Sequence, residues 1–374
     1  MAMADPTGDP FVLRAASGQA ALRPLPYGPT NVWSYSGSVP GPEIRVRQGD
    51  RIRVLAQNGL DEGTTIHWHG IRTPNAMDGV PFLTQDPIPV DGDFLYEFDA
   101  LDAGTFWYHP HQRSSEQVGR GLYGPLIVEE VDPIRVDRDL TWMLDDWRMT
   151  RAGQLSDDFD NRHDAMHGGR IGNSVTINGQ IPERIAVQSG ERIRLRLINA
   201  ANARIFGLDF GDFEPVVVAL DGQPVTPHAP DGDIVVIGPA MRVDLVIDMT
   251  GKPGEVVTVT DAFYEGLEYR LVDLAYGPDK LRDSVPDWPM DLPPNPLAEP
   301  DMASAARHQI VFNGGMMGQM MMGGGMGSMM GQMREGNMWF INGEAATGHM
   351  MDPLLVLPLG TSHVFEMDNR TAWH

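Results

Sequence analysis

Hydrophobic residues make up 42% of the 374 residues, which is enough to build the cores of two or three domains. A formal net charge of −23 argues against nucleic acid as a partner, because its phosphates would be repelled. The sequence contains no cysteine, which excludes disulfides, cysteine nucleophiles and a blue-copper site built from this chain alone.

The start of the chain carries no recognisable export or anchoring signal. Residues Met1 to Asp5 form neither a basic nor an apolar signal region, and no apolar run of the sequence is long enough to span a bilayer. We therefore expect no membrane insertion, and either a cytoplasmic protein or a mature form without its signal peptide.

The first predicted element is a β-hairpin over residues 41–54, in which two alternating strands flank a glycine turn. The pattern recurs at 181–195 and, more weakly, at 352–367. Each copy runs on to an asparagine, at Asn58, Asn199 and Asn369. Three widely spaced copies of one unit predict three related β domains. Short strands separated by turn signals are typical of Greek-key β-sandwiches, so we predict an all-β chain.

Two His-x-His pairs follow the first copy, at His67–His69 and His109–His111. Side chains alternate between the faces of a strand, so both members of a pair point the same way. Pro110 favours this extended backbone at its predecessor. Two facing pairs offer four imidazoles to one space, and imidazole suits copper, zinc, iron and nickel. A single pair is more often polar surface or core filling, whereas two pairs flanked by Trp68 and Trp107 favour a metal site.

The two histidine motifs resemble the first two copper motifs of the multicopper oxidases, the family of laccases, cuprous oxidases and bacterial copper-resistance oxidases. The flanking stretches 78–81 (DGVP) and 121–126 (GLYGPL) agree with the family, and the resemblance extends over the whole chain. It implies tandem cupredoxin-like domains that bind copper. It also implies an activity that passes electrons from Cu(I) or a phenolic reductant to O2, which is reduced to water.

The resemblance also implies roles for individual residues. His67 would bind the mononuclear copper of a three-copper cluster, and His69, His109 and His111 would bind its coupled copper pair. Asp78 matches the position of an acid near the cluster in the family, and is a candidate proton relay. The alternative for Asp78 is a simple turn residue in Asp-Gly.

We expect two complete domains and the start of a third. Domain one covers residues 5–131 and carries the histidine pairs, whereas domain two, 132–285, has lost its copper ligands. A Pro-rich linker follows at 286–304. The third domain, 305–374, stops at His374, before the third and fourth copper motifs of the family. The chain alone is therefore expected to be inactive as an oxidase, and to need a C-terminal segment or another chain to complete domain three.

Residues 316–338 form a Met-rich insertion, with ten methionines among glycines. The insertion lacks the periodicity of a core helix, and thioethers are soft ligands that select Cu(I). We expect the insertion to contact Cu(I), which favours a cuprous oxidase over a plain laccase. The loop Asp160–His167 is either a second soft patch or a solvated loop.

These features predict a copper-dependent oxidoreductase that acts in copper tolerance, in the periplasm or outside the cell as the family implies. A second hypothesis is a non-catalytic protein that binds copper and protects by sequestering it. A copper-free scaffold with the same fold is disfavoured, because it would not need both His-x-His pairs.

Overall fold

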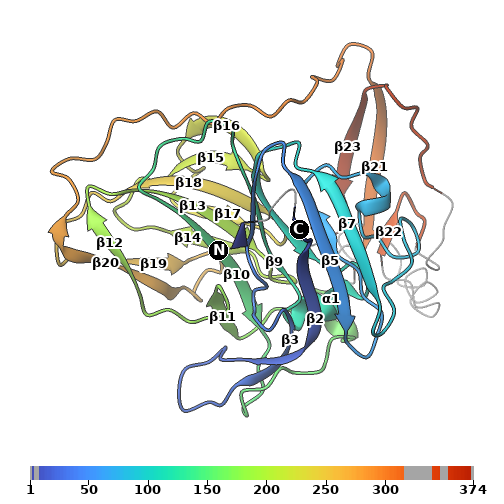
Figure 1. Ribbon diagram of the computed structural model, residues 1–374, viewed down its shortest axis with the longest axis horizontal. Helices are drawn as coiled ribbons and strands as arrows, with labels where there is room; N and C mark the ends of the chain where they lie inside the picture. Colours follow the sequence, from blue (N-terminus) through green and yellow to red (C-terminus); the bar gives the residue numbers. More distant parts are fainter. Residues whose placement is uncertain (1, 4–7, 316–338, 346–352, 372–374) are drawn as a thin grey trace. The chain divides into compact units, whose positions relative to one another are not determined.

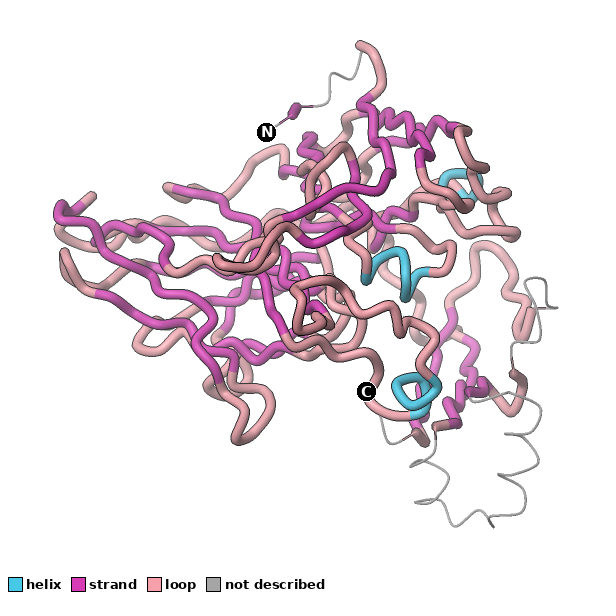
Figure 2. The backbone as a smooth tube through the Cα atoms, turned by 90° about the horizontal axis from the view of Figure 1, so that it is seen from below, coloured by secondary structure: helices cyan, strands magenta, loops and turns pink. Residues whose placement is uncertain are grey.

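The computed structural model of the protein describes residues 2–3, 8–315, 339–345 and 353–371. Within these residues strands and loops dominate, which confirms the predicted all-β class (Figure 2). The described helical segments are short: η1 (Asn75–Met77), α1 (Ser114–Gly119) and α2 (Arg162–Met166). None of them has the length and apolar character needed to cross a membrane.

The chain divides into two compact units. The first unit consists of residues 1–157 and 171–296, and the second of residues 158–170 and 297–374. The first unit contains two β-sandwiches, drawn in blue to orange in Figure 1. The domain boundaries expected from the sequence stay a prediction.

The first sandwich packs a five-stranded sheet, in the order β1-β4-β9-β8-β6, against a four-stranded sheet, in the order β3-β2-β5-β7. Alternation explains its core, because every second residue of β5 is buried. Leu13, Val54 and Phe98 from one sheet meet Trp68 and Phe106 from the other. The strands are β1 (Ala2–Met3), β2 (Phe11–Ala20), β3 (Thr30–Tyr35), β4 (Ile44–Arg47), β5 (Arg51–Gly59), β6 (His67–His69), β7 (Asp93–Asp99), β8 (Gly104–His109) and β9 (Gly124–Glu129).

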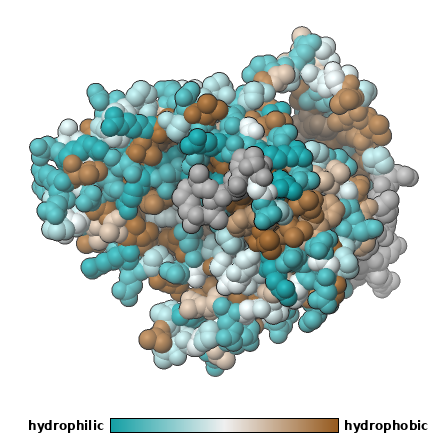
Figure 3. All heavy atoms as spheres, in the orientation of Figure 1, coloured by the Kyte–Doolittle hydropathy of each residue, from teal (hydrophilic) through white to brown (hydrophobic). Residues whose placement is uncertain are grey.

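The second sandwich has a six-stranded sheet, in the order β11-β10-β13-β18-β15-β16, and a five-stranded sheet, in the order β12-β20-β19-β14-β17. Its outer surface is mostly hydrophilic with scattered apolar side chains (Figure 3, left). The strands are β10 (Arg138–Trp147), β11 (Ser174–Ile177), β12 (Arg184–Ser189), β13 (Arg192–Asn199), β14 (Phe206–Asp209), β15 (Val216–Leu220), β16 (Gln223–His228), β17 (Val235–Ile237), β18 (Arg242–Asp248), β19 (Val256–Asp261) and β20 (Tyr269–Lys280).

The prediction of hairpins at the internal repeats is wrong. The repeated segments do form pairs of strands, but the two strands of a pair are not hydrogen-bonded to each other. β4 and β5 do not pair with each other: β4 pairs with β9, and β5 with β2 and β7. β12 and β13 likewise enter different sheets of the second sandwich. Each of these two copies is therefore an arch whose two strands face each other across a core. Two-residue periodicity identifies a strand and its buried face, but not its hydrogen-bonding partner.

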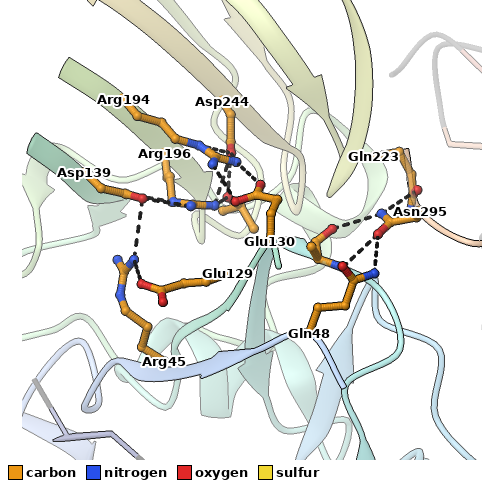
Figure 4. A network of polar contacts seen from close by, with 12 residues as sticks. Arg45, Gln48, Glu129, Glu130, Asp139, Arg194, Arg196, Gln223, Asp244 and Asn295 are labelled. Carbon is orange, nitrogen blue, oxygen red and sulfur yellow. Dashed lines mark hydrogen bonds and ion pairs between the residues drawn. The ribbon is translucent and has the colours of Figure 1, made fainter. Parts of the chain in front are cut away.

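The interface between the two sandwiches contains a buried network of charged side chains (Figure 4). Arg194 of β13 donates to Glu130 at 2.8 Å and to Asp244 at 2.7 Å, and all three side chains are at most 3% exposed. Arg196 donates to Asp139 at 2.8 Å. Arg194 and Arg196 thus face the first sandwich rather than solvent, and β13 is buried on both sides.

The first part of the predicted Pro-rich linker lies against the first unit. The Arg192 guanidinium donates to the carbonyl groups of Pro286 at 2.8 Å and Trp288 at 2.6 Å. The Asn295 amide bonds to both the N–H and the carbonyl of Ala103, at 2.8 and 2.9 Å, and donates to Gln223 at 3.0 Å (Figure 4). These contacts pin an irregular segment at two points.

The second unit contains a three-stranded sheet in the order β22-β21-β23, formed by β21 (Ala306–Gly314), β22 (Trp339–Ile341) and β23 (His363–Asn369). Within this unit the Trp339 indole donates to the Ala165 carbonyl of α2 at 2.8 Å. The third repeat, predicted as a hairpin, has a strand only from His363 onwards, since residues 353–362 form none. The Met-rich insertion 316–338 and His374 lie outside the described residues.

Candidate metal centre

The two histidine pairs occupy neighbouring antiparallel strands. β6 pairs with β8 in a register that sets His67 opposite His109, and His69 opposite Trp107. Trp68 lies on the other face of β6, buried against the rings of Tyr96 and Phe98 at centroid distances of 5.6 and 5.2 Å. Burial of this one large ring on the core side holds both histidines of β6 on the opposite side.

Four imidazoles converge at the end of this strand pair. His67, His109 and His111 each offer one ring nitrogen, and these three atoms lie within 4.8 Å of one another. The fourth ring is in contact with them, because Nδ1 of His69 lies 3.2 Å from Nε2 of His109. Metal–nitrogen bonds are about 2 Å long, so nitrogens on one metal lie roughly 3–4 Å apart. The donor set therefore fits transition metals that prefer imidazole, copper among them.

Neighbouring backbone groups orient these rings. Nδ1 of His67 lies 2.7 Å from the carbonyl oxygen of Asp78, and Nδ1 of His109 lies 3.1 Å from that of Pro110. A ring that donates through Nδ1 to a carbonyl presents Nε2 to a metal. The backbone N–H of His111 donates to the buried Thr65 hydroxyl at 3.2 Å. Two of the four rings thus have an orienting carbonyl partner, and the backbone of a third candidate ligand is fixed by a hydrogen bond.

The surroundings of the site lower the pKa of three of the four rings. Burial foremost, followed by the positive charge of Arg242, lowers the pKa of His69 to about 3. Burial also places the pKa of His109 well below its usual value, and burial followed by His67 lowers the pKa of His111. Since metals bind the neutral form of imidazole, these groups are ready to act as ligands at neutral pH.

Trp107 forms an apolar wall of the site. Its ring centroid lies 4.2 Å from that of His109 and 5.1 Å from that of His69. The indole is 4% exposed, and its Nε1 has no hydrogen-bond partner among the described residues. Trp107 therefore acts here through packing, and limits access of water to the two rings.

Asp78 lies beside the histidines, at the edge of the site. Its Oδ1 is 3.3 Å from Nδ1 of His67, and the Thr73 hydroxyl lies 3.4 Å from the same oxygen. The side chain is 34% exposed, so the carboxyl reaches both the site and solvent. This position is compatible with the predicted relay and with a purely orienting role.

The sequence patterns do not identify Arg242 as a neighbour of the site, and they do not explain why residue 70 is a glycine. Arg242 begins β18, in the second sandwich, and no motif around it points to a metal site. Gly70 follows His69 with a φ of +86°, and a Cβ there would lie 2.1 Å from the Arg242 guanidinium. The loop Asp160–His167 holds α2 instead, with the His163 and His167 rings stacked at 4.1 Å.

Comparisons with known proteins agree with this geometry. Two family models, both described as multicopper oxidase, match residues 18–132 and 138–266. The Copper resistance protein A homolog of Pseudomonas syringae pv. tomato is 33% identical over 241 residues, which is 52% of this chain and 41% of that protein. Multicopper oxidase MmcO of Mycobacterium tuberculosis is 31% identical over 296 residues, covering 72% of this chain and 55% of that protein. The chain thus spans about half the length of these curated relatives.

Solved structures resemble nearly the whole chain. A multi-copper oxidase from Pseudomonas thermotolerans has a TM-score of 0.84 and 32% identity, over 98% of this chain and 82% of that one. One from Pseudomonas parafulva has a TM-score of 0.82 and 36% identity, over 96% of this chain and 82% of that one. These likenesses confirm the predicted cupredoxin-like fold.

Proposed function

This chain belongs to the multicopper oxidase family, a class of copper-dependent oxidoreductases, and we propose that it supplies part of an oxidase that couples one-electron oxidation of Cu(I) or a phenolic substrate to reduction of O2 to water. The observation that carries the proposal is the convergence of four imidazoles on one space. Copper, when bound, supplies the one-electron redox chemistry that such a reaction requires.

In this proposal, residues of this chain bind the copper and limit the access of water to it. His67, His69, His109 and His111 are the proposed ligands, with His67 on the mononuclear copper and the other three on the coupled pair. The Asp78 carbonyl orients the His67 ring, and Trp107 keeps water from the His69 and His109 rings. Because Nδ1 of His67 and of His109 contacts a carbonyl group, Nε2 of each ring would be the atom that holds the metal.

Asp78 is the proposed proton relay. Its carboxyl lies between the His67 ring and solvent, and so is placed to take a proton from water and pass it towards the site. Replacement by Asn would preserve the carbonyl contact to His67 but remove the proton carrier. Slower O2 reduction with unchanged copper content is the result expected for a relay.

Features of the second unit favour its binding to a further segment or to another chain. Its described residues expose large apolar side chains, including Val356 at 82%, Leu359 at 104% and Met367 at 66%. Exposed strands and apolar faces of this kind favour pairing with another segment. A blue-copper site also needs a cysteine thiolate, and this sequence has none. We infer that a C-terminal segment or another chain completes the third domain and brings that site.

Copper tolerance is the proposed biological setting, in the periplasm or outside the cell. Three of the relatives are named as copper resistance proteins. The Met-rich insertion 316–338 supports Cu(I) rather than phenols as the reductant.

Copper loading tests the proposal. The purified chain should retain copper with nitrogen hyperfine structure in the Cu(II) spectrum, and His109→Ala should lose that signal. His228→Ala, at an exposed histidine elsewhere, is the matched control. An unchanged signal in His109→Ala would contradict the proposed site. The alternative, sequestration without turnover, predicts the same copper signal but no O2 uptake even after the third domain is completed.

A further inference from the structure

A buried cation from the second sandwich lies against the histidine strand pair. The Arg242 side chain is 5% exposed. A Cβ on Gly70, the residue after His69, would lie 2.1 Å from one guanidinium nitrogen and 2.9 Å from the central carbon. The φ of +86° at Gly70 also favours glycine. The glycine therefore lets the guanidinium come close to the end of β6.

The guanidinium also contacts β8, the strand that ends in His109. Nε of Arg242 donates to the Thr105 carbonyl at 3.3 Å. The other donors bond within the second sandwich, to the carbonyl groups of Ala240 and Asp221, both at 2.9 Å. One side chain thus touches both strands that carry the histidines, from a sandwich that contributes no ligand of its own.

The charge of Arg242 is only partly balanced. Its carboxylate contact is Asp221, at 3.1 Å, and that carboxylate is 51% exposed and therefore screened by water. The buried carboxylate of Asp244 also acts on Arg242, but Asp244 is already paired with Arg194 and Arg196. The three carbonyl contacts are dipoles without net charge. Positive charge in a buried environment acts over several ångströms, because the surroundings screen it poorly.

We propose that Arg242 is a positioning residue of the metal centre, which holds the His69–Gly70 end of β6 and shifts bound copper towards Cu(I). The inference rests on the proposed copper site. A nearby positive charge destabilises Cu(II) more than Cu(I), since Cu(II) carries one more unit of charge. The guanidinium therefore favours the reduced metal and raises its reduction potential, which helps the centre to accept electrons.

Three substitutions separate charge from packing. Arg242→Met removes the cation and keeps an apolar side chain of some length. Arg242→Lys keeps the cation but loses the fork that bonds three carbonyls. Asp221→Asn removes the balancing charge and leaves Arg242 in place. Asn suits position 221, because it tolerates the φ of +49° there and can still accept from the Arg242 N–H.

The measurement is a redox titration of the full chain loaded with copper, followed by the Cu(II) resonance signal with nitrogen splitting. For Arg242→Met we expect binding of Cu(II) to strengthen about tenfold relative to binding of Cu(I). This lowers the midpoint reduction potential by about 59 mV for one electron. For Asp221→Asn we expect a shift of opposite sign, about threefold because the carboxylate is exposed. Arg242→Lys should retain most of the wild-type midpoint.

Arg192→Met is the control, since this buried arginine pairs with Asp248 at the other end of the β13–β18 strand pair. Its midpoint should equal that of the wild type. Unchanged midpoints in both Arg242→Met and Asp221→Asn would overturn the inference. If Arg242→Met does not fold, an unchanged midpoint in Asp221→Asn alone would do so. A wild-type chain without the nitrogen-split signal would instead contradict the copper site itself.

Discussion

Nδ1 of His67 lies 2.7 Å from the backbone carbonyl oxygen of Asp78, eleven residues further along the chain. The contact depends on the turn that follows, because Gly79 has a φ of +73° and lies against the backbone of Ile66. The turn at Asp78 and Gly79 contributes no proposed metal ligand, but it sets the orientation of the His67 ring.

Gly79→Ala should damage the metal site through this contact. A Cβ at Gly79 would lie 1.9 Å from the Ile66 carbonyl oxygen, so the turn must move and withdraw the Asp78 carbonyl from His67. We expect copper affinity to fall by about 10–100-fold. Unfolding in urea should show a free-energy loss at least about 2 kcal/mol larger than that of the control.

Gly49→Ala is that control. Gly49 has a similar φ of +92°, but no atom lies within 4 Å of an added Cβ. It therefore measures the backbone penalty alone, and copper binding should be unaffected. Equal behaviour of the two variants would show that the Gly79 turn does not orient His67.

The buried network between the sandwiches should be costly to break. Arg194→Met leaves Glu130 without its guanidinium partner and Asp244 with only the longer contact from Arg196, at 3.3 Å, and the Arg194, Glu130 and Asp244 side chains are nearly inaccessible to solvent. Removing one member of a buried ion pair typically costs about 3–5 kcal/mol of unfolding free energy. Arg51→Ala, in an exposed pair with Asp99, should cost less than about 1 kcal/mol. Similar urea midpoints for both variants would refute this ranking.

Some features could be predicted from the sequence because they are local. Alternation around Trp68 indicates which way His67 and His69 point, and a second pair of the same kind indicates a shared site. The hydrogen-bonding partner of a strand can lie far away in the sequence, which is why the sequence pattern predicts hairpins where the structure has arches. In the sequence Arg194 looks like a solvent-exposed strand residue, and only the packing of the first sandwich against β13 buries it. Arg242 meets Thr105 across 137 positions of sequence, and no spacing rule connects them.

The same network should make stability depend on pH in the acid range. Burial raises the pKa of Asp139, but the charges of Arg196, Arg194 and Arg45 and the bond from Arg196 outweigh it and lower the pKa to about 2. The unfolded chain takes up this proton near pH 3.8. The contribution is therefore complete above that pH and is lost as the pH falls towards 2, with a magnitude of roughly 2 kcal/mol.

Asp139→Asn should flatten this part of the stability profile. Chemical denaturation at several pH values between about 5 and about 2.5 would measure how steeply the unfolding free energy changes with pH. These values bracket the titration at about 3.8. Asp283→Asn, at a side chain that is 99% exposed, should keep the wild-type slope. A slope that is identical in all three proteins would show that Asp139 does not contribute.

The chain of 374 residues by itself should not be a competent oxidase. Four histidines converge in its described residues, and a family cluster of three coppers needs more ligands than that, as well as a cysteine site through which electrons enter. Copper-loaded protein of verified mass should therefore show no intense blue absorption and negligible O2 uptake with Cu(I) or a phenol. Supplying the segment that completes the third domain should restore both, whereas Asp78→Asn in the completed protein should slow O2 uptake without changing its copper content. Robust O2 uptake by a preparation whose mass matches this chain, with no second polypeptide present, would require an electron-entry site made of other residues.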